Sequence, residues 1–225
     1  MKIKVKILKI EPVTHDVKRF IVEKPENYKF IPGQATRVSI DSPSWQDEDR
    51  PFTFTSLVDD PHLEFTIKGY PSHKGVTEKL HALSPGDSLI IRKVFGAIKY
   101  KGRGVFIAGG AGITPFIAIL RQLRKDNMIS GNRLIFSNKT KEDIILEDEL
   151  KEMFIEKPDD LMLTLTEEKS QDYKNGMIDE NFLKKYIDDF NQNFYLCGPP
   201  GMVEQLTKNL KRLGANIDSV VFEGK

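Results

Sequence analysis

The sequence predicts a two-domain fold in which a six-stranded antiparallel Greek-key β-barrel precedes a five-stranded parallel α/β sheet. Short runs in which apolar and polar residues alternate fill the first hundred residues, as expected for antiparallel strands. After them, apolar segments of strand length alternate with amphipathic segments, as expected for a parallel sheet covered by helices on both faces. The character changes at residues 101–104, Lys-Gly-Arg-Gly. We therefore place one domain at residues 1–101 and the other at residues 102–225.

The six barrel strands are predicted from runs that are rich in β-branched and aromatic residues. These runs cover residues 3–10, 17–22, 35–40, 51–56, 63–68 and 88–93. Turn residues separate them at Ile31-Pro32-Gly33-Gln34, Asp59-Asp60-Pro61 and Ser84-Pro85-Gly86-Asp87. One helix is predicted over residues 75–83, because Pro85 and Gly86 then end it.

The second domain is predicted from five apolar runs with helical segments between them. The strands are expected at residues 105–108, 133–137, 161–165, 193–197 and 219–222. The helices are expected at residues 114–124, 147–153, 180–186 and 202–213. This alternation is typical of an open parallel sheet, in which ligands bind at the carboxyl ends of the strands.

The composition excludes several classes of protein. The chain has 225 residues, a net charge of +1 and 30% charged residues, which argues against a nucleic-acid-binding protein. The single Cys excludes a disulfide within the chain, a four-Cys zinc site and an all-Cys iron–sulfur cluster. His15, His62, His73 and His81 are scattered without metal-ligand spacing, so we expect no metal site.

Neither a leader nor a membrane span is apparent in the sequence. Residues 1–10 alternate charged and apolar side chains, which is strand periodicity and not the apolar block of a signal peptide. No apolar run reaches the roughly 18 residues that a membrane span requires. We expect a soluble, cytoplasmic and monomeric protein that binds neither a membrane nor a nucleic acid.

A glycine-rich segment, Gly109 to Pro115, lies between a predicted strand and a predicted amphipathic helix. Glycines let the backbone approach a pyrophosphate closely, and a helix N-terminus offers free N–H groups and a positive dipole end. Pro115 suits the first helical turn, although it replaces the third glycine of the G-x-G-x-x-G fingerprint. A tight turn without a ligand is the alternative. The position at a strand's carboxyl end favours a nucleotide site.

The single Cys starts a second loop of this kind, Cys197-Gly198-Pro199-Pro200-Gly201-Met202. It too lies between a strand end and a helix start, and its Gly and Pro residues favour an open turn. A lone Cys is more often a small buried hydrophobe. Because Cys197 is expected at the same sheet edge as the glycine loop, contact with a bound nucleotide is the other interpretation.

The stretch Arg50-Pro51-Phe52-Thr53 continues as Phe-Thr-Ser, so a predicted strand carries a cation, an aromatic ring and several hydroxyls. These are the groups that a flavin needs: charge compensation, a flat contact and a hydrogen bond near the reactive nitrogen. Residues 50 and 52 share one strand face. Thr53 needs a local twist or bulge to reach the same ligand. The alternative is an exposed edge strand.

Taken in order, these segments resemble the ferredoxin–NADP reductase superfamily over almost the whole chain. The family's flavin motif, Arg-x-Tyr-Ser/Thr-x-x-Ser, is matched by residues 50–56, and its pyrophosphate loop by residues 74–77. Residues 30–34, the glycine loop and Cys197-Gly198-Pro199 also match. Phe52 replaces the usual Tyr, which removes a hydroxyl and implies weaker flavin binding.

The resemblance implies roles for individual residues. Thr53, Cys197 and Glu223 would act at the reacting rings. The flavin, FAD, would be bound by Arg50, Pro51, Phe52, Thr53, Ile67, Lys68, Tyr70, Lys74, Gly75, Val76, Thr77 and Phe222. The nicotinamide nucleotide, NADH or NADPH, would be bound by Gly110, Ala111, Gly112, Ile113, Thr114, Cys197, Gly198, Pro199 and Met202.

The resemblance also implies an activity. We expect an FAD-dependent NAD(P)H reductase that passes electrons to ferredoxin or flavodoxin, because no iron–sulfur domain is fused. Residues 1–101 carry 17 Lys and Arg against 13 Asp and Glu, a small excess that would suit an acidic partner. An NAD(P)H:flavin reductase that uses free flavin is one alternative, and a non-catalytic nucleotide-binding module is another.

The preferred nucleotide depends on the segment after the third strand of the second domain. NADPH-selective members often have Ser-Arg there, whereas this chain has Thr166-Glu167-Glu168. Carboxylates would repel the additional phosphate of NADPH, although Lys169 or Asn138-Lys139 could compensate. The segment therefore favours NADH and leaves NADPH as the alternative.

Overall fold

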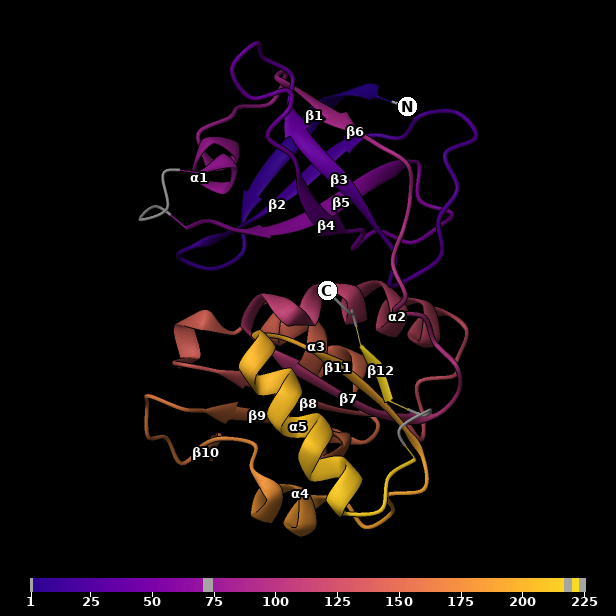
Figure 1. Ribbon diagram of the computed structural model, residues 1–225, viewed down its shortest axis with the longest axis vertical. Coiled ribbons are helices and arrows are strands. Elements are labelled where there is room, and N and C mark those ends of the chain that lie inside the picture. The colour runs from indigo at the N-terminus through magenta and orange to yellow at the C-terminus, as the bar shows by residue number, and fades with distance from the viewer. Residues whose placement is uncertain (1, 71–74, 217–219, 223–225) are drawn as a thin grey trace.

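The computed structural model describes residues 2–70, 75–216 and 220–222. An antiparallel barrel, drawn at the top of Figure 1, lies on a parallel sheet flanked by helices. Both parts of the predicted fold are confirmed. Among the described residues, no helix has the length and apolar character needed to cross a membrane.

The barrel consists of six strands in the order β4-β3-β6-β1-β2-β5. Every neighbouring pair in this order is antiparallel. A bridge between Phe54 and Phe65 brings the two edges of the sheet together, so the barrel is nearly closed. The strands are β1 (Ile3–Pro12), β2 (Val17–Glu23), β3 (Ala35–Ile40), β4 (Arg50–Thr53), β5 (His62–Lys68) and β6 (Ser88–Ile91).

Aromatic side chains fill the barrel. Phe20, Phe54 and Phe65 are fully buried, and the rings of Phe30 and Phe54 stack with their centroids 4.3 Å apart. The predicted turn at residues 31–34 is present, since the Gln34 amide donates to the Ile31 carbonyl over 3.1 Å. Gly33 has a φ of +96° in that turn, a conformation that glycine adopts without strain.

Strand β4 is shorter than the predicted strand over residues 51–56, because the chain changes its partner. The Phe54 amide still donates to Gln34, beside β3, whereas the Thr55 amide donates to the Glu64 carbonyl of β5 over 2.9 Å. This change of partner closes the barrel and ends β4 at Thr53. Helix α1 (Val76–His81) lies within the predicted range of residues 75–83.

The second domain has five parallel strands in the order β9-β8-β7-β11-β12, with a two-residue β10 added at the β9 edge. The strand order reverses between β7 and β11, which makes the carboxyl ends of these two strands a topological switch point. The strands are β7 (Gly104–Gly109), β8 (Arg133–Asn138), β9 (Leu161–Leu165), β10 (Lys174–Asn175), β11 (Asn193–Cys197) and β12 (Val220–Phe222).

Helices cover both faces of this sheet because each strand buries side chains in both directions. On β7, Phe106 belongs to the cluster with helices α2 and α3, and Ile107 to the cluster with α4 and α5. The helices are α2 (Thr114–Lys125), α3 (Glu147–Met153), α4 (Glu180–Tyr186) and α5 (Pro200–Arg212), with 3-10 turns at Gly110–Ile113, Lys141–Asp143 and Pro158–Asp160.

Contacts join the barrel to the sheet. Val17 of β2 and Ile98 of the connecting segment are buried in the same cluster as the α2 side chains. The Tyr195 hydroxyl donates to the Gly102 carbonyl over 2.7 Å and accepts from the Lys101 amide over 2.9 Å. The connection between the two domains is therefore tied to the centre of the second sheet.

His81, the last residue of α1, makes the stability of the barrel depend on pH. Its ring nitrogen Nε2 lies 2.9 Å from the Ile67 carbonyl, which requires the hydrogen on Nε2. Burial lowers the pKa of His81 below its ordinary value of 6.5. The stabilisation by the neutral ring is therefore complete above about pH 6.5 and is lost as the pH falls through the lowered pKa.

We expect His81→Gln, which keeps a donor for the Ile67 carbonyl but cannot titrate, to flatten the acid side of the stability profile. One proton changes the unfolding free energy by at most about 1.4 kcal/mol per pH unit, and the half-buried position makes the effect smaller. Urea unfolding of both proteins at several pH values measures it. Identical profiles would show that His81 does not set the dependence.

Candidate functional site

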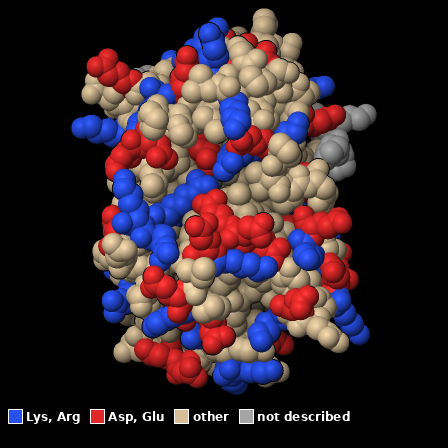
Figure 2. Space-filling view, turned by 180° about the vertical axis from the view of Figure 1, so that it is seen from behind, with Lys and Arg blue, Asp and Glu red and all other residues tan. Residues whose placement is uncertain are grey.

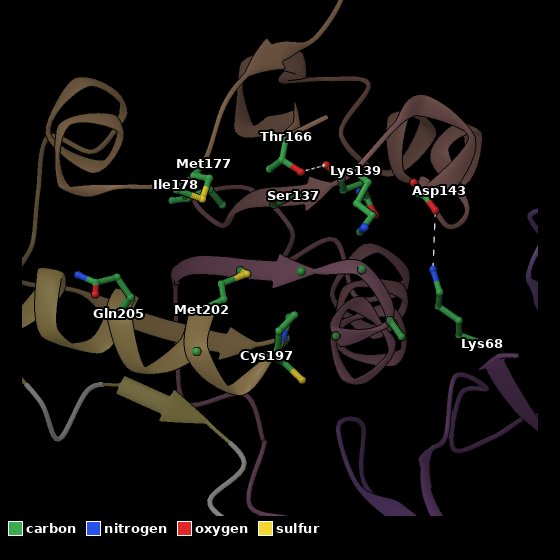
Figure 3. Close-up of a pocket in the computed structure, with 18 of the residues that line it drawn as sticks. Lys68, Ser137, Lys139, Asp143, Thr166, Met177, Ile178, Cys197, Met202 and Gln205 are labelled. Carbon is green, nitrogen blue, oxygen red and sulfur yellow. Dashed lines mark hydrogen bonds and ion pairs between the residues drawn. The ribbon is translucent and has the colours of Figure 1, made fainter. Parts of the chain in front are cut away.

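A cavity of about 910 Å³ lies over the carboxyl ends of the parallel strands. The glycine loop, the ends of β8 and β9, and the start of α5 line it. In Figure 3, Thr166 and Lys139 lie on one side of the cavity, and Met202 and Cys197 lie on the other. Its size is in the range of pockets that hold cofactors and nucleotides.

The glycine loop forms the floor of this cavity. Gly110 has a φ of +52°, and a side chain added there would meet no protein atom within 4 Å. A ligand could therefore approach the backbone at this position. Gly112 instead faces protein, where an added Cβ would lie 2.5 Å from the Cys197 carbonyl carbon and 2.6 Å from the Gly198 nitrogen. The two glycines thus serve different purposes.

The rest of the loop leads into α2. Ile113 is fully buried, so its side chain belongs to the core and does not reach the cavity. The Thr114 hydroxyl donates to the Ala111 carbonyl over 3.0 Å. Pro115 occupies the first turn of α2, as the sequence predicts.

A smaller cavity of about 220 Å³ lies between the barrel and the glycine loop. Phe52 and Thr53 both line it, together with Pro51. They are neighbours in sequence and would point apart in an ideal strand. Both reach the cavity because β4 ends at Thr53, where the chain changes its partner.

The two cavities meet at four residues that line both of them: Lys68, Tyr70, Ala111 and Cys197. Lys68 ends β5 and Tyr70 follows it, so the barrel supplies one wall of the junction. Ala111 and Cys197 come from the two loops of the parallel sheet. Cys197 is half-buried and its thiol is not in a disulfide.

Other residues predicted for the flavin site lie in different surroundings. The Arg50 side chain is 50% exposed and lies 3.8 Å from Glu48, and it lines neither cavity described above. Ile67 and Val76 are buried in the barrel core. Thr77 lines the smaller cavity, and Gly75 caps the start of α1 with extended backbone.

The predicted residues of the second loop lie along the larger cavity, which Gly198, Pro199 and Met202 all line. Phe222 is described only by its backbone, which pairs with Leu196 in β12. Lys74 and Glu223 lie outside the described residues.

Several cavity residues were not predicted from the sequence, because no sequence motif marks them as ligand-binding residues. They include Asp143, Met177, Ile178 and Gln205. The side-chain amide of Asn138 is buried at the end of β8, and neither its nitrogen nor its oxygen has a hydrogen-bond partner. At the rim, the Lys139 ammonium lies 2.9 Å from the Glu167 carboxylate, which raises the pKa of Lys139.

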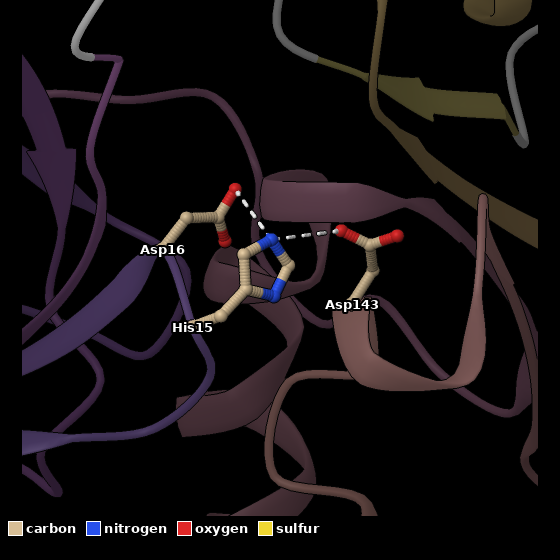
Figure 4. A group of neighbouring side chains, drawn as sticks. All are labelled: His15, Asp16 and Asp143. Atoms are coloured by element: carbon tan, nitrogen blue, oxygen red, sulfur yellow. Dashed lines mark ion pairs between the residues drawn. The ribbon is translucent and has the colours of Figure 1, made fainter.

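Charged side chains from both domains meet beside the junction. The Lys68 ammonium lies 2.8 Å from Asp16 and 3.7 Å from Asp143. His15 Nε2 lies 3.7 Å from Asp16 and 3.9 Å from Asp143 (Figure 4). Burial alone would lower the pKa of Lys68, but the two carboxylates outweigh it and the pKa is raised. Burial likewise opposes a lower pKa for Asp143, but hydrogen bonds from Thr140 and the charge of Lys68 prevail.

His15, Asp16 and Asp143 each offer one ligand atom, and these atoms lie within 4.8 Å of one another, which is close enough to hold a metal ion. The sequence showed no metal-ligand spacing, because Asp143 is far from the other two along the chain. Lys68 already supplies a cation to both carboxylates. The cluster is therefore an ion-pair network that joins the two domains.

The two halves of the chain match two family models. Residues 2–94 match an FAD-binding domain, and residues 106–208 match an oxidoreductase NAD-binding domain. NADH-cytochrome b5 reductase 2-A of Vanderwaltozyma polyspora is 29% identical over 95% of this chain and 81% of its own length. The naphthalene 1,2-dioxygenase system ferredoxin–NAD(P)(+) reductase component of Pseudomonas putida is 26% identical over 97% of this chain and 67% of its own.

The share of the relatives that this chain covers varies. The reductase component of propane 2-monooxygenase from Rhodococcus jostii is 26% identical over 98% of this chain, which spans only 63% of that protein. Solved structures share the fold. The flavohem-like FAD/NAD-binding domain of nitric oxide dioxygenase from Vibrio cholerae superposes with a TM-score of 0.85 at 20% identity, covering 98% of this chain and 97% of that one.

Proposed function

Because the chain belongs to the ferredoxin–NADP reductase superfamily, we propose that it is an NAD(P)H-dependent reductase that transfers electrons through FAD to a small electron-transfer protein. It is an oxidoreductase with an FAD-binding and an NAD-binding domain. One observation supports the proposed transfer of electrons between the two domains. The cavity of the barrel and the cavity of the parallel sheet meet at Lys68, Tyr70, Ala111 and Cys197.

The residues that line the two cavities fit the two cofactors. Phe52 offers a flat apolar contact and Thr53 a hydroxyl in the smaller cavity, as an isoalloxazine requires. Gly110 leaves its backbone open to a pyrophosphate in the larger one, in the 3-10 turn that leads into α2. Bound FAD supplies the chemistry of accepting a hydride and releasing single electrons.

The contribution of the protein is mainly positional. The barrel and the parallel sheet hold their ligands on opposite walls of one junction, so that the transfer between them becomes effectively unimolecular. Cys197 and Ala111 form the wall on the nucleotide side, and Lys68 and Tyr70 form the wall on the flavin side. Arg50 would neutralise a flavin phosphate from outside the cavities, as the resemblance implies.

The acceptor is proposed from chemistry and from relatives. The single Cys leaves no iron–sulfur centre of the all-Cys type within these 225 residues, so electrons would pass from the FAD to a redox centre outside them. Ferredoxin or flavodoxin is our primary proposal, and relatives named as cytochrome b5 reductases add a haem protein as a further acceptor. A groove on the barrel lined by Lys2, Arg37, Arg92 and Lys93, with Phe95, supports an acidic partner.

The face of the molecule that Figure 2 shows does not carry one continuous charged patch. In Figure 2, Lys and Arg side chains are interspersed with Asp and Glu over both domains. Three of the groove cations are also paired with carboxylates, Arg37 and Arg92 with Asp49 and Lys2 with Asp47. An acidic acceptor would therefore meet a modest excess of positive charge, which implies weak and transient docking.

We predict a preference for NADH over NADPH, which Glu167→Gln should reduce. Glu167 pairs with Lys139 at the cavity rim, so the cation is neutralised and the carboxylate would oppose the additional phosphate of NADPH. Freeing Lys139 should raise kcat/KM for NADPH by about tenfold and change that for NADH little. Steady-state assays with both nucleotides test this. A wild-type protein that prefers NADPH would contradict it.

The proposed function is tested by mixing the purified protein with NADH under anaerobic conditions in a stopped-flow spectrometer. Bleaching of a flavin that remains bound through desalting, followed by reoxidation on adding ferredoxin, flavodoxin or cytochrome b5, supports the proposal. A colourless protein that oxidises NADH only with added flavin would identify a flavin reductase. A protein that holds flavin but is not reduced by either nucleotide would rule out both.

A further inference from the structure

The side chains on one face of strand β5 are polar. Its residues Leu63, Phe65 and Ile67 are buried in the barrel core, so the alternation of the strand turns Glu64, Thr66 and Lys68 the other way. This face lies toward the second domain: Glu64 pairs with Arg121, and Lys68 lies near Asp143. Thr66, between them, lines the smaller cavity.

Arg121 makes the more deeply buried of the two connections. It projects from α2, the helix that follows the glycine loop, and its side chain is only 15% exposed. Nη1 donates to Glu64 and to the Thr55 carbonyl, each over 2.6 Å. On its own domain, Nε and Nη2 bind the two oxygens of Glu149 at 2.6 and 2.9 Å. One guanidinium therefore joins α2, α3 and the barrel.

The Glu64 carboxylate extends this connection to the flavin cavity. The Thr55 hydroxyl donates to Glu64 Oε1 over 2.8 Å and lies 3.2 Å from the Thr66 hydroxyl. An ionised carboxylate only accepts, so the single Thr55 hydrogen is committed to it. Thr66 must then donate to Thr55, which leaves the Thr66 oxygen as an acceptor toward the cavity.

We infer that Arg121 is a positioning residue that holds the glycine loop in register with the flavin cavity, acting through Glu64, Thr55 and Thr66. This inference rests on the proposed function. α2 begins at the loop that would hold the nucleotide, and Arg121 fixes that helix to the strand face that would hold the flavin. Glu64 and Lys68 lie about 13 Å apart along β5, so connections to the second domain flank Thr66 on both sides.

Ion pairing is sufficient to keep Arg121 charged in this position. Burial would lower the pKa of the guanidinium, but Glu149 and Glu64 raise it instead. The planar guanidinium also bonds to three partners at once, and a Lys ammonium cannot reach all three with the same geometry. Arg121→Lys should therefore keep the charge and still lose part of the positioning.

The test compares three variants with the wild-type protein. Arg121→Met removes the charge and keeps an unbranched chain, while Arg121→Lys keeps the charge. The matched control is Arg124→Met on the same helix, where Arg124 pairs with Glu156 at an exposed site. Each protein is purified with its flavin, and rates are expressed per bound flavin.

The first readout is flavin reduction by NADH in anaerobic stopped-flow experiments. Arg121→Met should slow the reduction at saturating NADH by about 10- to 100-fold, because small misplacements of reacting groups have effects of this size. The NADH concentration that gives half-maximal rate should change by less than about threefold. Arg121→Lys should lie in between, and Arg124→Met should match the wild type.

A wild-type rate per bound flavin in Arg121→Met would overturn the inference, as would a loss that saturating NADH restores. If Arg121→Met does not fold, Arg121→Lys decides: a wild-type rate in that variant overturns the inference. Failure of the wild-type protein itself to reduce flavin would instead contradict the proposed function.

The second readout does not depend on activity. Hydrogen–deuterium exchange of the purified protein should increase in α2 and at the Thr55 amide in Arg121→Met, because the connection between the domains is lost. Arg124→Met should leave these amides as protected as in the wild type. Unchanged exchange at both segments in Arg121→Met would overturn the inference even if the reductase activity were absent in all proteins.

Discussion

Gly112→Ala is expected to abolish nucleotide binding and to lower the free energy of unfolding by about 3 kcal/mol. An added Cβ would lie 2.5 Å from the Cys197 carbonyl carbon and 2.6 Å from the Gly198 nitrogen. Both neighbours are backbone atoms, so no side-chain rotation can relieve the collision. The two loops would have to separate, which would displace the floor of the larger cavity from its wall.

Urea unfolding measures the loss of stability, and titration with oxidised NAD measures the loss of binding. Gly201→Ala serves as the stability control, because a Cβ at Gly201 would meet nothing within 4 Å and alanine suits a helical turn. It should leave the unfolding free energy unchanged or raise it slightly. A Gly112→Ala protein as stable as Gly201→Ala would show that the loops can separate at little cost.

The strands and helices could be predicted because local patterns dictate them. Alternation in residues 63–68 and unbroken apolar runs in 105–108 distinguish a barrel strand from a buried parallel strand. Helices α3 and α4 begin and end at the predicted residues. The boundary that we propose at residue 101 falls in the connection between β6 and β7. The carbonyl of the next residue, Gly102, accepts a hydrogen bond from the Tyr195 hydroxyl.

The details of the smaller cavity could not be predicted, because they depend on partners distant in sequence. From the sequence, the hydroxyls of Thr55 and Ser56 are candidates for contact with a flavin. In the structure, the Thr55 hydroxyl donates to the Glu64 carboxylate and the Ser56 hydroxyl accepts from the Glu64 amide. No motif or spacing near Glu64 in the sequence indicates that its carboxylate pairs with Arg121. The change of partner at the end of β4 is likewise a property of the closed barrel and not of the local pattern.

The ion pairs beside the cavities escaped prediction for the same reason. Asp143 ends a short turn in which it caps Thr140, a local arrangement that the sequence could have suggested. Its position 3.7 Å from Lys68 depends on how the two domains meet. Periodicity and motifs in the sequence therefore do not predict which residues make the contacts between the two domains.

The second large effect is expected at Cys197, where Cys197→Leu should slow flavin reduction by about 100-fold. Cys197 lines both cavities, so a longer side chain would occupy the junction through which the two rings must meet. The rate of bleaching at saturating NADH, per bound flavin, is the measurement. Flavin content should be retained, because Phe52 and Thr53 lie on the barrel wall of the smaller cavity.

Cys197→Ser is the matched control, since it changes the polarity of the side chain and hardly its size. If steric access through the junction decides the rate, the Ser variant should stay within about tenfold of the wild type and far above the Leu variant. Equal losses in both would mean that the thiol itself contributes. A Leu variant that is reduced as fast as the wild type would place the meeting point of the two rings away from Cys197. That result would contradict the proposal that the transfer takes place at this junction.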